Sequence, residues 1–290
     1  MRWGDRVASG MTEDHQETAG SEHATGARRS DQRLEGRQIL VVGAGGPENP
    51  GELAANGQAI SILAAREGAH IAVADINLDA AAHTVDAIRG EGGTASAVIA
   101  DVREPEGCQR LVGQAIDVLG SIDGLVLNVG IGSGMGLAGT DVGTWDEVFA
   151  VNLRSHFLIC QSAVPRFDRG SIVFIGSVAG LRPGTFSPSY DASKAGLIGL
   201  CRHVAMEGAR QGIRANLVAP GLMDTPMGRG VSSARPQRER IRIPLGRQGT
   251  AWEVAWATVF LLSEEASYIT AQVLAVDGGL STLPLTSGAS

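Results

Sequence analysis

The sequence contains few aromatic residues and few cysteines. Aromatic side chains make up 4% of the 290 residues, so alanine, valine, isoleucine and leucine must build most of the core. The three cysteines, Cys108, Cys160 and Cys201, match no metal-ligand or disulfide spacing. We interpret them as small buried hydrophobic residues of a protein from a reducing cytoplasm, and we expect no metal site.

Long apolar runs and a basic charge balance are absent as well. No stretch reaches the roughly 18 apolar residues that a membrane helix needs, and the N-terminal residues lack the apolar segment of a signal peptide. The net charge of −7 argues against a nucleic-acid partner, because such proteins usually carry a basic patch or stripe. We therefore expect a cytoplasmic protein that binds neither membranes nor nucleic acids.

Residues 1–35 are polar and charged, and this composition predicts a disordered tail. From Gly36 onward, short apolar runs alternate with helical patterns. The expected strands are 38–42, 71–75, 95–100, 124–127, 171–175, 214–218 and 272–276, and the expected helices are 58–67, 80–89, 106–119, 145–163, 190–210 and 252–262. This alternation predicts one α/β domain over residues 36–290, a doubly wound, Rossmann-type parallel sheet with helices on both faces.

Polar or glycine-rich residues follow most of these strands. They are Gly43, Asp75, Asp101 with Val102, Asn128 with Gly130, Ser177, and Pro220 with Gly221. Ligands of open α/β sheets bind outside the carboxyl ends of the strands. The pattern therefore predicts a binding site along this edge of the sheet.

The first of these strand ends suggests a phosphate site. Gly43 and Gly45 follow the strand, and Asn56 and Gly57 open the next helix, where free N–H groups favour an anion. The usual G-x-G-x-x-G spacing is absent because residues 47–52 lengthen the loop, so a plain surface loop stays open as an alternative. Asp75 can accept hydrogen bonds from ribose hydroxyls and would repel a 2′-phosphate, which favours NAD, although aspartate is also a common turn residue.

Tyr190 and Lys194 lie four residues apart, with Ser177 before them. On a helix this spacing places both side chains on one face. A neighbouring ammonium lowers a phenol's pKa from its ordinary value of roughly 10, so the tyrosine can act as a general acid or base. Taken alone, the pair could equally belong to an ordinary surface helix.

In order and spacing, these motifs resemble the classical short-chain dehydrogenase/reductase family from about Gly36 to Leu280. The resemblance implies an enzyme that interconverts a secondary alcohol and a ketone with NAD. It implies that Tyr190 is the general acid/base, that Ser177 binds the reacting oxygen, that Lys194 lowers the pKa of Tyr190 and binds the nicotinamide ribose, and that Asn152 holds a relay water. The implied cofactor-binding residues are Gly43, Gly45, Asn56, Gly57, Asp75, Asp101, Val102, Asn128, Gly130, Tyr190, Lys194, Pro220, Gly221 and Thr225.

The sequence departs from the family's pattern in the cofactor half. Val42 replaces the usual threonine and Ala55 replaces a glycine. The second position of the family's Asn-Asn-Ala-Gly motif is lost, which leaves Asn128-Val129-Gly130. An alanine at position 55 requires a negative φ. A catalytically silent NAD-binding regulator or scaffold, and dehydration or epimerisation on the same fold, therefore stay open. Enoyl reductases of the superfamily place the lysine further from the tyrosine, so the spacing here favours alcohol or ketone chemistry.

Three segments should form the substrate pocket: residues 131–140, residues 178–188, and a lid over about 222–247. The first contains Gly132, Gly134 and Gly136, which suggests flexibility. Arginines of the lid could bind an anionic substrate or an acyl carrier, or could simply face solvent; they are Arg229, Arg235, Arg238, Arg240 and Arg242. The family often places a basic, carrier-docking residue at the position of Leu158, so the carrier alternative is weakened.

Apolar residues lie on more than one face of the expected helices 145–163 and 190–210. Examples are Phe157, Leu158, Leu197 and Leu200. In the family, the corresponding helices contact partner subunits, so the resemblance implies a homotetramer. The alternative is that both helices are simply buried against the sheet.

Overall fold

The computed structural model describes residues 32–50, 53–234 and 241–283. Its main sheet has seven parallel strands in the order β3-β2-β1-β4-β5-β6-β9. These strands are β1 (Gln38–Val42), β2 (His70–Asp75), β3 (Thr94–Ile99), β4 (Gly124–Leu127), β5 (Gly170–Ile175), β6 (Ile213–Pro220) and β9 (Val273–Val276). The predicted doubly wound parallel sheet is confirmed, and each predicted strand lies within two residues of an observed one.

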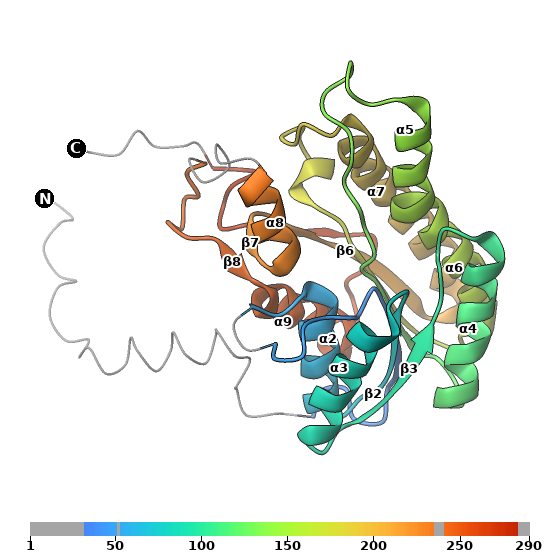
Figure 1. Ribbon diagram of the computed structural model, residues 1–290. Helices are drawn as coiled ribbons and strands as arrows, with labels where there is room; N and C mark the ends of the chain where they lie inside the picture. The colour runs from blue at the N-terminus through green and yellow to red at the C-terminus, as the bar shows by residue number, and fades with distance from the viewer. Residues whose placement is uncertain (1–31, 51–52, 235–240, 284–290) are drawn as a thin grey trace, which may run out of the picture.

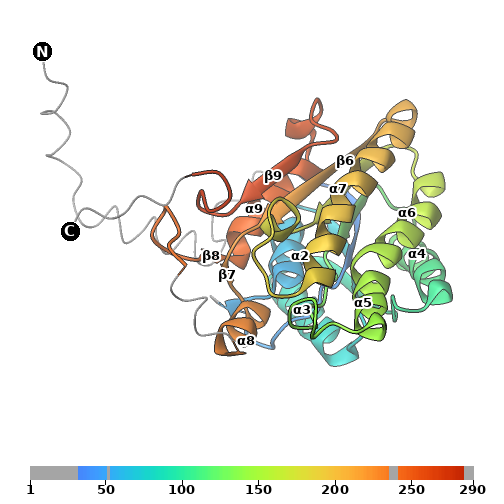
Figure 2. The ribbon, with the colours of Figure 1, turned by 90° about the horizontal axis from the view of Figure 1, so that it is seen from above.

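Helices cover both faces of the sheet (Figures 1 and 2). One face packs against α2 (Asn56–Arg66), α3 (Leu78–Gly90) and α9 (Ala251–Leu262). The other packs against α4 (Pro105–Leu119), α6 (Ser155–Ala163) and α7 (Pro188–Gly208). Helix α5 (Val142–Phe149) leads into α6.

The two faces explain why the strands read as continuous apolar runs. Along β1, Val41 enters the core under α2 and α9, whereas its neighbours Leu40 and Val42 enter the core under α4, α6 and α7. Successive side chains of a strand point to opposite faces, so a sheet that is covered twice needs apolar residues at both parities. The carboxyl ends of all seven strands consequently lie along one edge, where the predicted site residues follow them.

The helix predicted over 145–163 contains an irregular turn. It begins earlier, with α5, and then passes through one π-helical segment, η2 (Ala150–Arg154), before α6. Hydrophobic periodicity does not report a single widened turn, and such π segments are frequent at functional sites. The predicted helix 190–210 corresponds to α7, which begins at Pro188, where a proline is favoured because its missing N–H would be unpaired anyway. A short 3₁₀ turn, η5 (Ala209–Gln211), follows it.

The boundaries of the predicted tail and lid need adjustment. Residues 1–31 lie outside the described residues, but Leu34, which we assigned to the tail, is fully buried, and Arg33 pairs with Glu67 at 2.9 Å. In the lid, β7 (Met223–Asp224) pairs with β8 (Gly249–Thr250), and α8 (Pro226–Ala234) lies between them in sequence. Arg235, Arg238 and Arg240 lie outside the described residues.

The apolar residues expected at a subunit interface divide into two groups. Leu197 is fully buried against the sheet, so it belongs to the core and not to an interface. Phe157 is 46% exposed, and Val142, Trp145 and Met206 are also exposed on α5 and α7. Among the described residues, no helix is long and apolar enough to cross a membrane. All three cysteines are buried free thiols, as predicted.

Candidate active site

Tyr190 and Lys194 lie in the first turns of α7. The Lys194 ammonium nitrogen is 5.7 Å from the centroid of the Tyr190 ring, and the lysine side chain is almost entirely buried. The ammonium donates a hydrogen bond of 3.1 Å to the carbonyl of Ile175, the last residue of β5. Burial lowers the pKa of Lys194 to about 8. The pair therefore has the geometry that the sequence predicted.

Ser177 follows β5 and begins the short 3₁₀ helix η4 (Val178–Gly180). Its hydroxyl oxygen accepts the Ala179 N–H at 3.1 Å. Helix η4 packs tightly on α7: a methyl group on Gly180 would come within 2.6 Å of the Lys194 carbonyl oxygen. This close packing fixes the serine beside the helix that carries Tyr190 and Lys194.

Asn152 lies in the π segment and is fully buried. Its amide oxygen accepts the Ile131 N–H at 2.8 Å, and its amide nitrogen donates to the Ile131 carbonyl at 2.9 Å and to the Ser193 hydroxyl at 3.0 Å. The side chain thus ties the residues after β4 to α7. Because both amide hydrogens are used in these bonds, the predicted role in holding a relay water stays a prediction.

Glycines after β4 leave room for these side chains. A methyl group on Gly130 would lie 3.0 Å from the Lys194 ammonium nitrogen, and one on Gly132 would lie 3.6 Å from the Tyr190 ring. Since 3.0 Å is tighter than an ordinary contact, only glycine fits at position 130 without a shift of the lysine. The structure therefore brings Asn152, Ser177, Tyr190 and Lys194 together at the ends of β4 and β5.

The glycine loop closes against the start of α2 despite its length. Gly43 has φ +79°, and its carbonyl accepts the Asn128 side-chain N–H at 2.6 Å. Ala55 precedes α2 with φ −75°, the negative value that its methyl group requires. No side chain caps α2, so its first N–H groups stay available to an anion. These residues fit a bound pyrophosphate.

Gly57 should be the least replaceable residue of this loop. A methyl group there would lie 2.0 Å from the Gly43 carbonyl oxygen, so backbone must move. We expect Gly57→Ala to destabilise the fold by about 1–3 kcal/mol. The matched control is Gly113→Ala in α4, where the methyl group meets nothing within 4 Å and helix propensity should add up to about 1 kcal/mol. Denaturant unfolding measures both; equal effects would contradict the close approach.

Asp75 lies at the end of β2, beside the glycine loop. One carboxylate oxygen accepts the Gly45 N–H at 2.9 Å, and the other accepts the Asn77 N–H at 3.0 Å. Each oxygen can accept a further hydrogen bond. The carboxylate is therefore held in place and can still receive the two hydroxyls of a ribose.

Asp101 is less available than the sequence suggested. Arg103 donates to Oδ2 at 2.6 Å and to Oδ1 at 3.0 Å, and these hydrogen bonds lower the pKa of Asp101. The carbonyl of the neighbouring Val102 accepts a hydrogen bond from the Cys108 thiol. Contact of residues 101 and 102 with an adenine ring stays a prediction.

The last predicted cofactor residues follow β6. Pro220 ends the strand, and the Gly221 N–H donates to the Val276 carbonyl at 2.9 Å. The Thr225 hydroxyl accepts the Gly228 N–H at 3.0 Å, at the start of α8. These bonds hold the lid strand β7 beside the carboxyl end of the sheet.

The glycine-rich segment after β4 is hydrogen-bonded to the residues before α7, and the flexibility that we expected of it stays a prediction. Its Gly136 N–H donates to the Phe186 carbonyl at 2.6 Å, and the Ser187 hydroxyl donates to the Ser133 carbonyl. The glycines at positions 134 and 136 have positive φ and form a tight turn. Their role is therefore to shape the turn.

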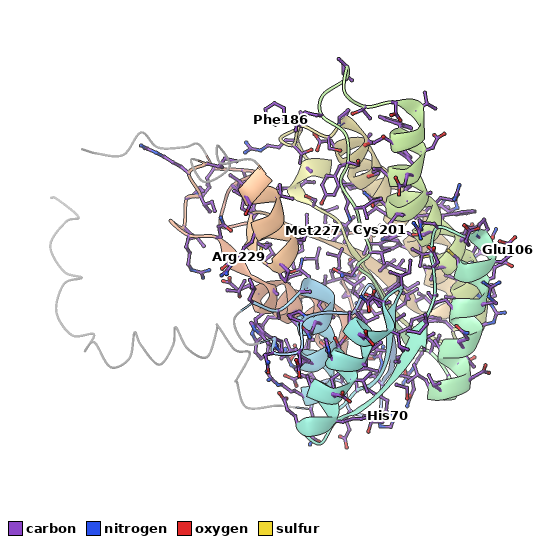
Figure 3. The ribbon with its side chains drawn as sticks, viewed as in Figure 1. His70, Glu106, Phe186, Cys201, Met227 and Arg229 are labelled. Atoms are coloured by element: carbon purple, nitrogen blue, oxygen red, sulfur yellow. The ribbon has the colours of Figure 1, made fainter. Side chains whose placement is uncertain are left out.

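Large apolar side chains are exposed around these segments. Met135, Phe186 and Met227 are each more than half exposed. Figure 3 shows Phe186 on the segment before α7 and Met227 on α8, where Arg229 also lies. The Arg229 guanidinium pairs with both oxygens of Asp224, at 2.7 Å and 2.9 Å. The positive charge of Arg229 is thus already neutralised by a carboxylate of the lid.

Sequence reasoning missed the groups that support the four central side chains. These are the carbonyl of Ile175, the backbone of Ile131 and the hydroxyl of Ser193. Two of the three contacts use backbone atoms, whose partners depend on the fold and not on residue type. Within the described part of the chain, no group of histidine, cysteine, aspartate or glutamate side chains could hold a metal ion.

Comparison with known proteins gives consistent relatives. The family described as enoyl-(acyl carrier protein) reductase matches residues 54–281. The 3-oxoacyl-(acyl-carrier-protein) reductase of Thermotoga maritima is 36% identical over 86% of this chain and 99% of its own length. L-rhamnose 1-dehydrogenase (NAD(P)(+)) of a Sphingomonas species is 34% identical over 85% of this chain and 97% of its own.

A solved structure shows the same arrangement of elements. The 7α-hydroxysteroid dehydrogenase complexed with NADH and 7-oxo glycochenodeoxycholic acid superposes with a TM-score of 0.79 at 32% identity. The match covers 86% of this chain and 96% of that chain. Both the fold and the sequence of this enzyme therefore resemble those of the chain described above.

Proposed function

Because the chain belongs to the classical short-chain dehydrogenase/reductase family, whose members are oxidoreductases of hydroxyl and carbonyl groups, we propose that it interconverts a secondary alcohol and a ketone with NAD. The observation that carries this proposal is the convergence of Asn152, Ser177, Tyr190 and Lys194 at the ends of β4 and β5. The nicotinamide, when bound, accepts or donates the hydride, and the protein supplies position and electrostatics.

The four side chains divide the proton chemistry between them. The Tyr190 phenolate takes the proton of the substrate alcohol, and in the reverse direction the Tyr190 hydroxyl gives the proton to the carbonyl oxygen. The Ser177 hydroxyl donates a hydrogen bond to the reacting oxygen, where negative charge develops. Lys194, 5.7 Å from the phenol ring, favours the phenolate by its positive charge. Asn152 fixes the neighbouring loop through Ile131, and the relay water predicted for it would connect Lys194 with solvent.

The cofactor lies, in this proposal, along the carboxyl edge of the sheet. The first N–H groups of α2, beside the close-packed Gly43 and Gly57, would hold its pyrophosphate. Its adenosine ribose binds the carboxylate of Asp75. The remaining proposed contacts come from Gly45, Asn56, Asp101, Val102, Asn128, Gly130, Pro220, Gly221 and Thr225.

NAD should bind more tightly than NADP, because the carboxylate of Asp75 repels a 2′-phosphate. We expect the wild-type protein to bind NADH at least about tenfold more tightly than NADPH, and Asp75→Asn to narrow that ratio. Energy transfer from tryptophan to bound nicotinamide measures both affinities. Glu48→Gln, an exposed carboxylate in the lengthened loop, is the matched control and should leave the ratio unchanged. A wild-type preference for NADPH would refute the assignment.

The substrate is proposed to be an uncharged alcohol or ketone of modest size. Apolar side chains at positions 135, 186 and 227 are exposed at the three pocket segments, and Arg229 is already paired with Asp224. Leu158 stands where carrier-dependent relatives often have a basic residue, which disfavours an acyl carrier. The lysine four residues after the tyrosine disfavours enoyl chemistry, although the matching family carries that description.

Activity assays separate this proposal from its alternatives. A panel of secondary alcohols with NAD should yield NADH with at least one member, and product analysis distinguishes oxidation from dehydration or epimerisation. A protein that binds NADH and turns over no member of a broad panel would support the silent regulator. The fit of Gly43, Ala55 and Gly57 at the start of α2 favours a protein that still binds the cofactor over one that has lost its phosphate site.

We further propose that the enzyme is a cytoplasmic homotetramer. The support for self-association is the set of exposed apolar side chains on the outer helices, namely Val142, Trp145, Phe157 and Met206. The three buried thiols suit a reducing compartment. Sedimentation of the purified protein tests the tetramer, and a monomer at micromolar concentration would exclude it.

A further inference from the structure

The π segment leaves one backbone carbonyl in need of a donor. The Ser155 N–H donates to the Ala150 carbonyl, five residues earlier, and not to Val151, four residues earlier, as it would in an α-helix. The Val151 carbonyl instead accepts the hydroxyl of Ser155 at 2.6 Å. Since Val151 immediately precedes Asn152, this hydroxyl closes the turn that positions the buried amide.

His156 supports that hydroxyl from within the protein. Its Nδ1 lies 3.1 Å from the Ser155 oxygen. The hydroxyl hydrogen points to the Val151 carbonyl, so the oxygen accepts and Nδ1–H of the imidazole donates. The ring is fully buried and its Nε2 makes no hydrogen bond of standard geometry, although hydrogen bonding to the Leu127 and Val151 backbone offsets a small part of the effect of burial on its pKa. An imidazole in such a place costs free energy that an apolar residue would not.

The imidazole lies behind the candidate site. It stacks on Phe174, with ring centroids 6.3 Å apart, and Phe174 precedes Ile175, whose carbonyl binds the Lys194 ammonium. Burial, and next the positive charge of Lys194, lower the pKa of His156 to about 3. The ring is therefore neutral at physiological pH and acts as a fixed hydrogen-bond donor, not as a titrating base.

We propose that His156 and Ser155 are positioning residues that hold the π turn so that Asn152 keeps its place between Ile131 and Ser193, beside Lys194. The inference rests on the proposed dehydrogenase function and concerns residues to which neither the family pattern nor the sequence assigned a role. The hydrogen bonds run from Nδ1 of His156 to the Ser155 oxygen, and from there to the Val151 carbonyl. Neither residue touches the substrate.

The test replaces each link in turn. His156→Phe keeps an aromatic ring on Phe174 and removes Nδ1–H, and Ser155→Ala removes the hydroxyl. We expect each to lower kcat about tenfold, because small displacements of catalytic groups are costly, while the affinity for NADH stays unchanged. His156→Asn, whose amide can place a donor near the position of Nδ1, should recover most of the loss. Ser162→Ala on the same helix, where the hydroxyl contacts Arg166, is the control.

A second readout needs no substrate. The chain has two tyrosines, so in a Tyr268→Phe background the ultraviolet absorbance of tyrosinate reports Tyr190 alone. We expect His156→Phe and Ser155→Ala to move the Tyr190 transition to higher pH, since a displaced Asn152 releases Ser193, the neighbour of Lys194, and so weakens the support of the phenolate. The double variant should show no more than the larger single effect, because the two residues act as a unit.

The outcomes are distinguishable. A wild-type protein without turnover removes the proposed function, and the tyrosinate titration still tests the positioning pair. Variants that lose thermal stability but keep the wild-type kcat and Tyr190 transition would overturn the inference, since that result describes a purely structural role. If His156→Phe does not fold, Ser155→Ala and His156→Asn decide the question alone.

Discussion

Replacing Tyr190 by phenylalanine is expected to lower kcat by about 10³-fold or more, with NADH binding nearly unchanged. The substitution removes one oxygen and leaves the ring that packs against Gly132. General acid–base catalysis contributes typically 10²–10⁴-fold, and here one group handles the proton in both directions. Initial rates with the best alcohol of the panel, and a fluorescence titration of NADH, measure the two quantities separately.

The chain supplies its own control for this experiment. Tyr268 is the only other tyrosine and is fully exposed. Tyr268→Phe should therefore retain the full rate. Turnover of Tyr190→Phe within a few fold of wild type would remove the tyrosine from the mechanism. Loss of both turnover and NADH binding would instead indicate damage to the cofactor site.

Lys194→Met is expected to abolish turnover and at the same time to stabilise the fold by about 1–3 kcal/mol. Burial lowers the pKa of this lysine from 10.5 to about 8, so folding takes a charged group out of water at neutral pH. Methionine has similar length and no charge. The gain is offset in part because the Ile175 carbonyl loses its donor. Such a variant would trade function for stability.

The stability difference between Lys194→Met and its parent should depend on pH in a definite direction. Between pH of about 8 and 10.5 the unfolded chain holds the Lys194 proton and the folded chain does not. The lysine's contribution to stability therefore rises with pH across this window. The stability difference between Lys194→Met and its parent should be largest below pH 8 and should shrink toward pH 10.5. A Tyr190→Phe background removes the phenol's own titration from the comparison.

Lys194 can also be observed directly. It is the only lysine in the sequence, so isotope-labelled lysine gives a single side-chain resonance to follow with pH. A transition near the ordinary lysine value, together with no stability gain in Lys194→Met, would mean that the ammonium is well solvated. The proposed support of the phenolate would then weaken, because water would screen the charge.

The sequence predicted the fold and the spacing of the central residues well, for a physical reason. Buried parallel strands need apolar residues on both faces. The polar or glycine residues that follow Val42, Leu127 and Ile175 mark the ends of strands, and the parallel topology brings these ends to one edge of the sheet. The Tyr190–Lys194 pair depends only on helical spacing, which is local. Both features survive without knowledge of tertiary contacts.

Other features could not be predicted in this way. The π segment at Ala150–Arg154 adds one residue to one turn and leaves the apolar pattern intact. The pairing of Asp101 with Arg103 and the burial of Leu197 depend on side-chain packing. The glycines at 134 and 136 have positive φ, and the Gly136 N–H donates to the Phe186 carbonyl before α7, a contact that the glycine spacing alone does not indicate. Glycine marks a permitted conformation, not motion.

Because β9 and the residues after it are synthesised last, their partners β6 and Leu245 remain without these contacts until the end of translation. The Leu245 N–H donates to the Gly278 carbonyl at 3.1 Å, and β9 forms the edge beside β6. Tyr190 and Lys194 emerge long before residues 273–279. A nascent chain therefore contains the candidate catalytic residues while β6 still lacks β9 on one side and Leu245 still lacks its partner Gly278. We expect chaperones that bind exposed strand edges to recognise β6 during this interval. The interval ends when the turn at Gly278 leaves the ribosome.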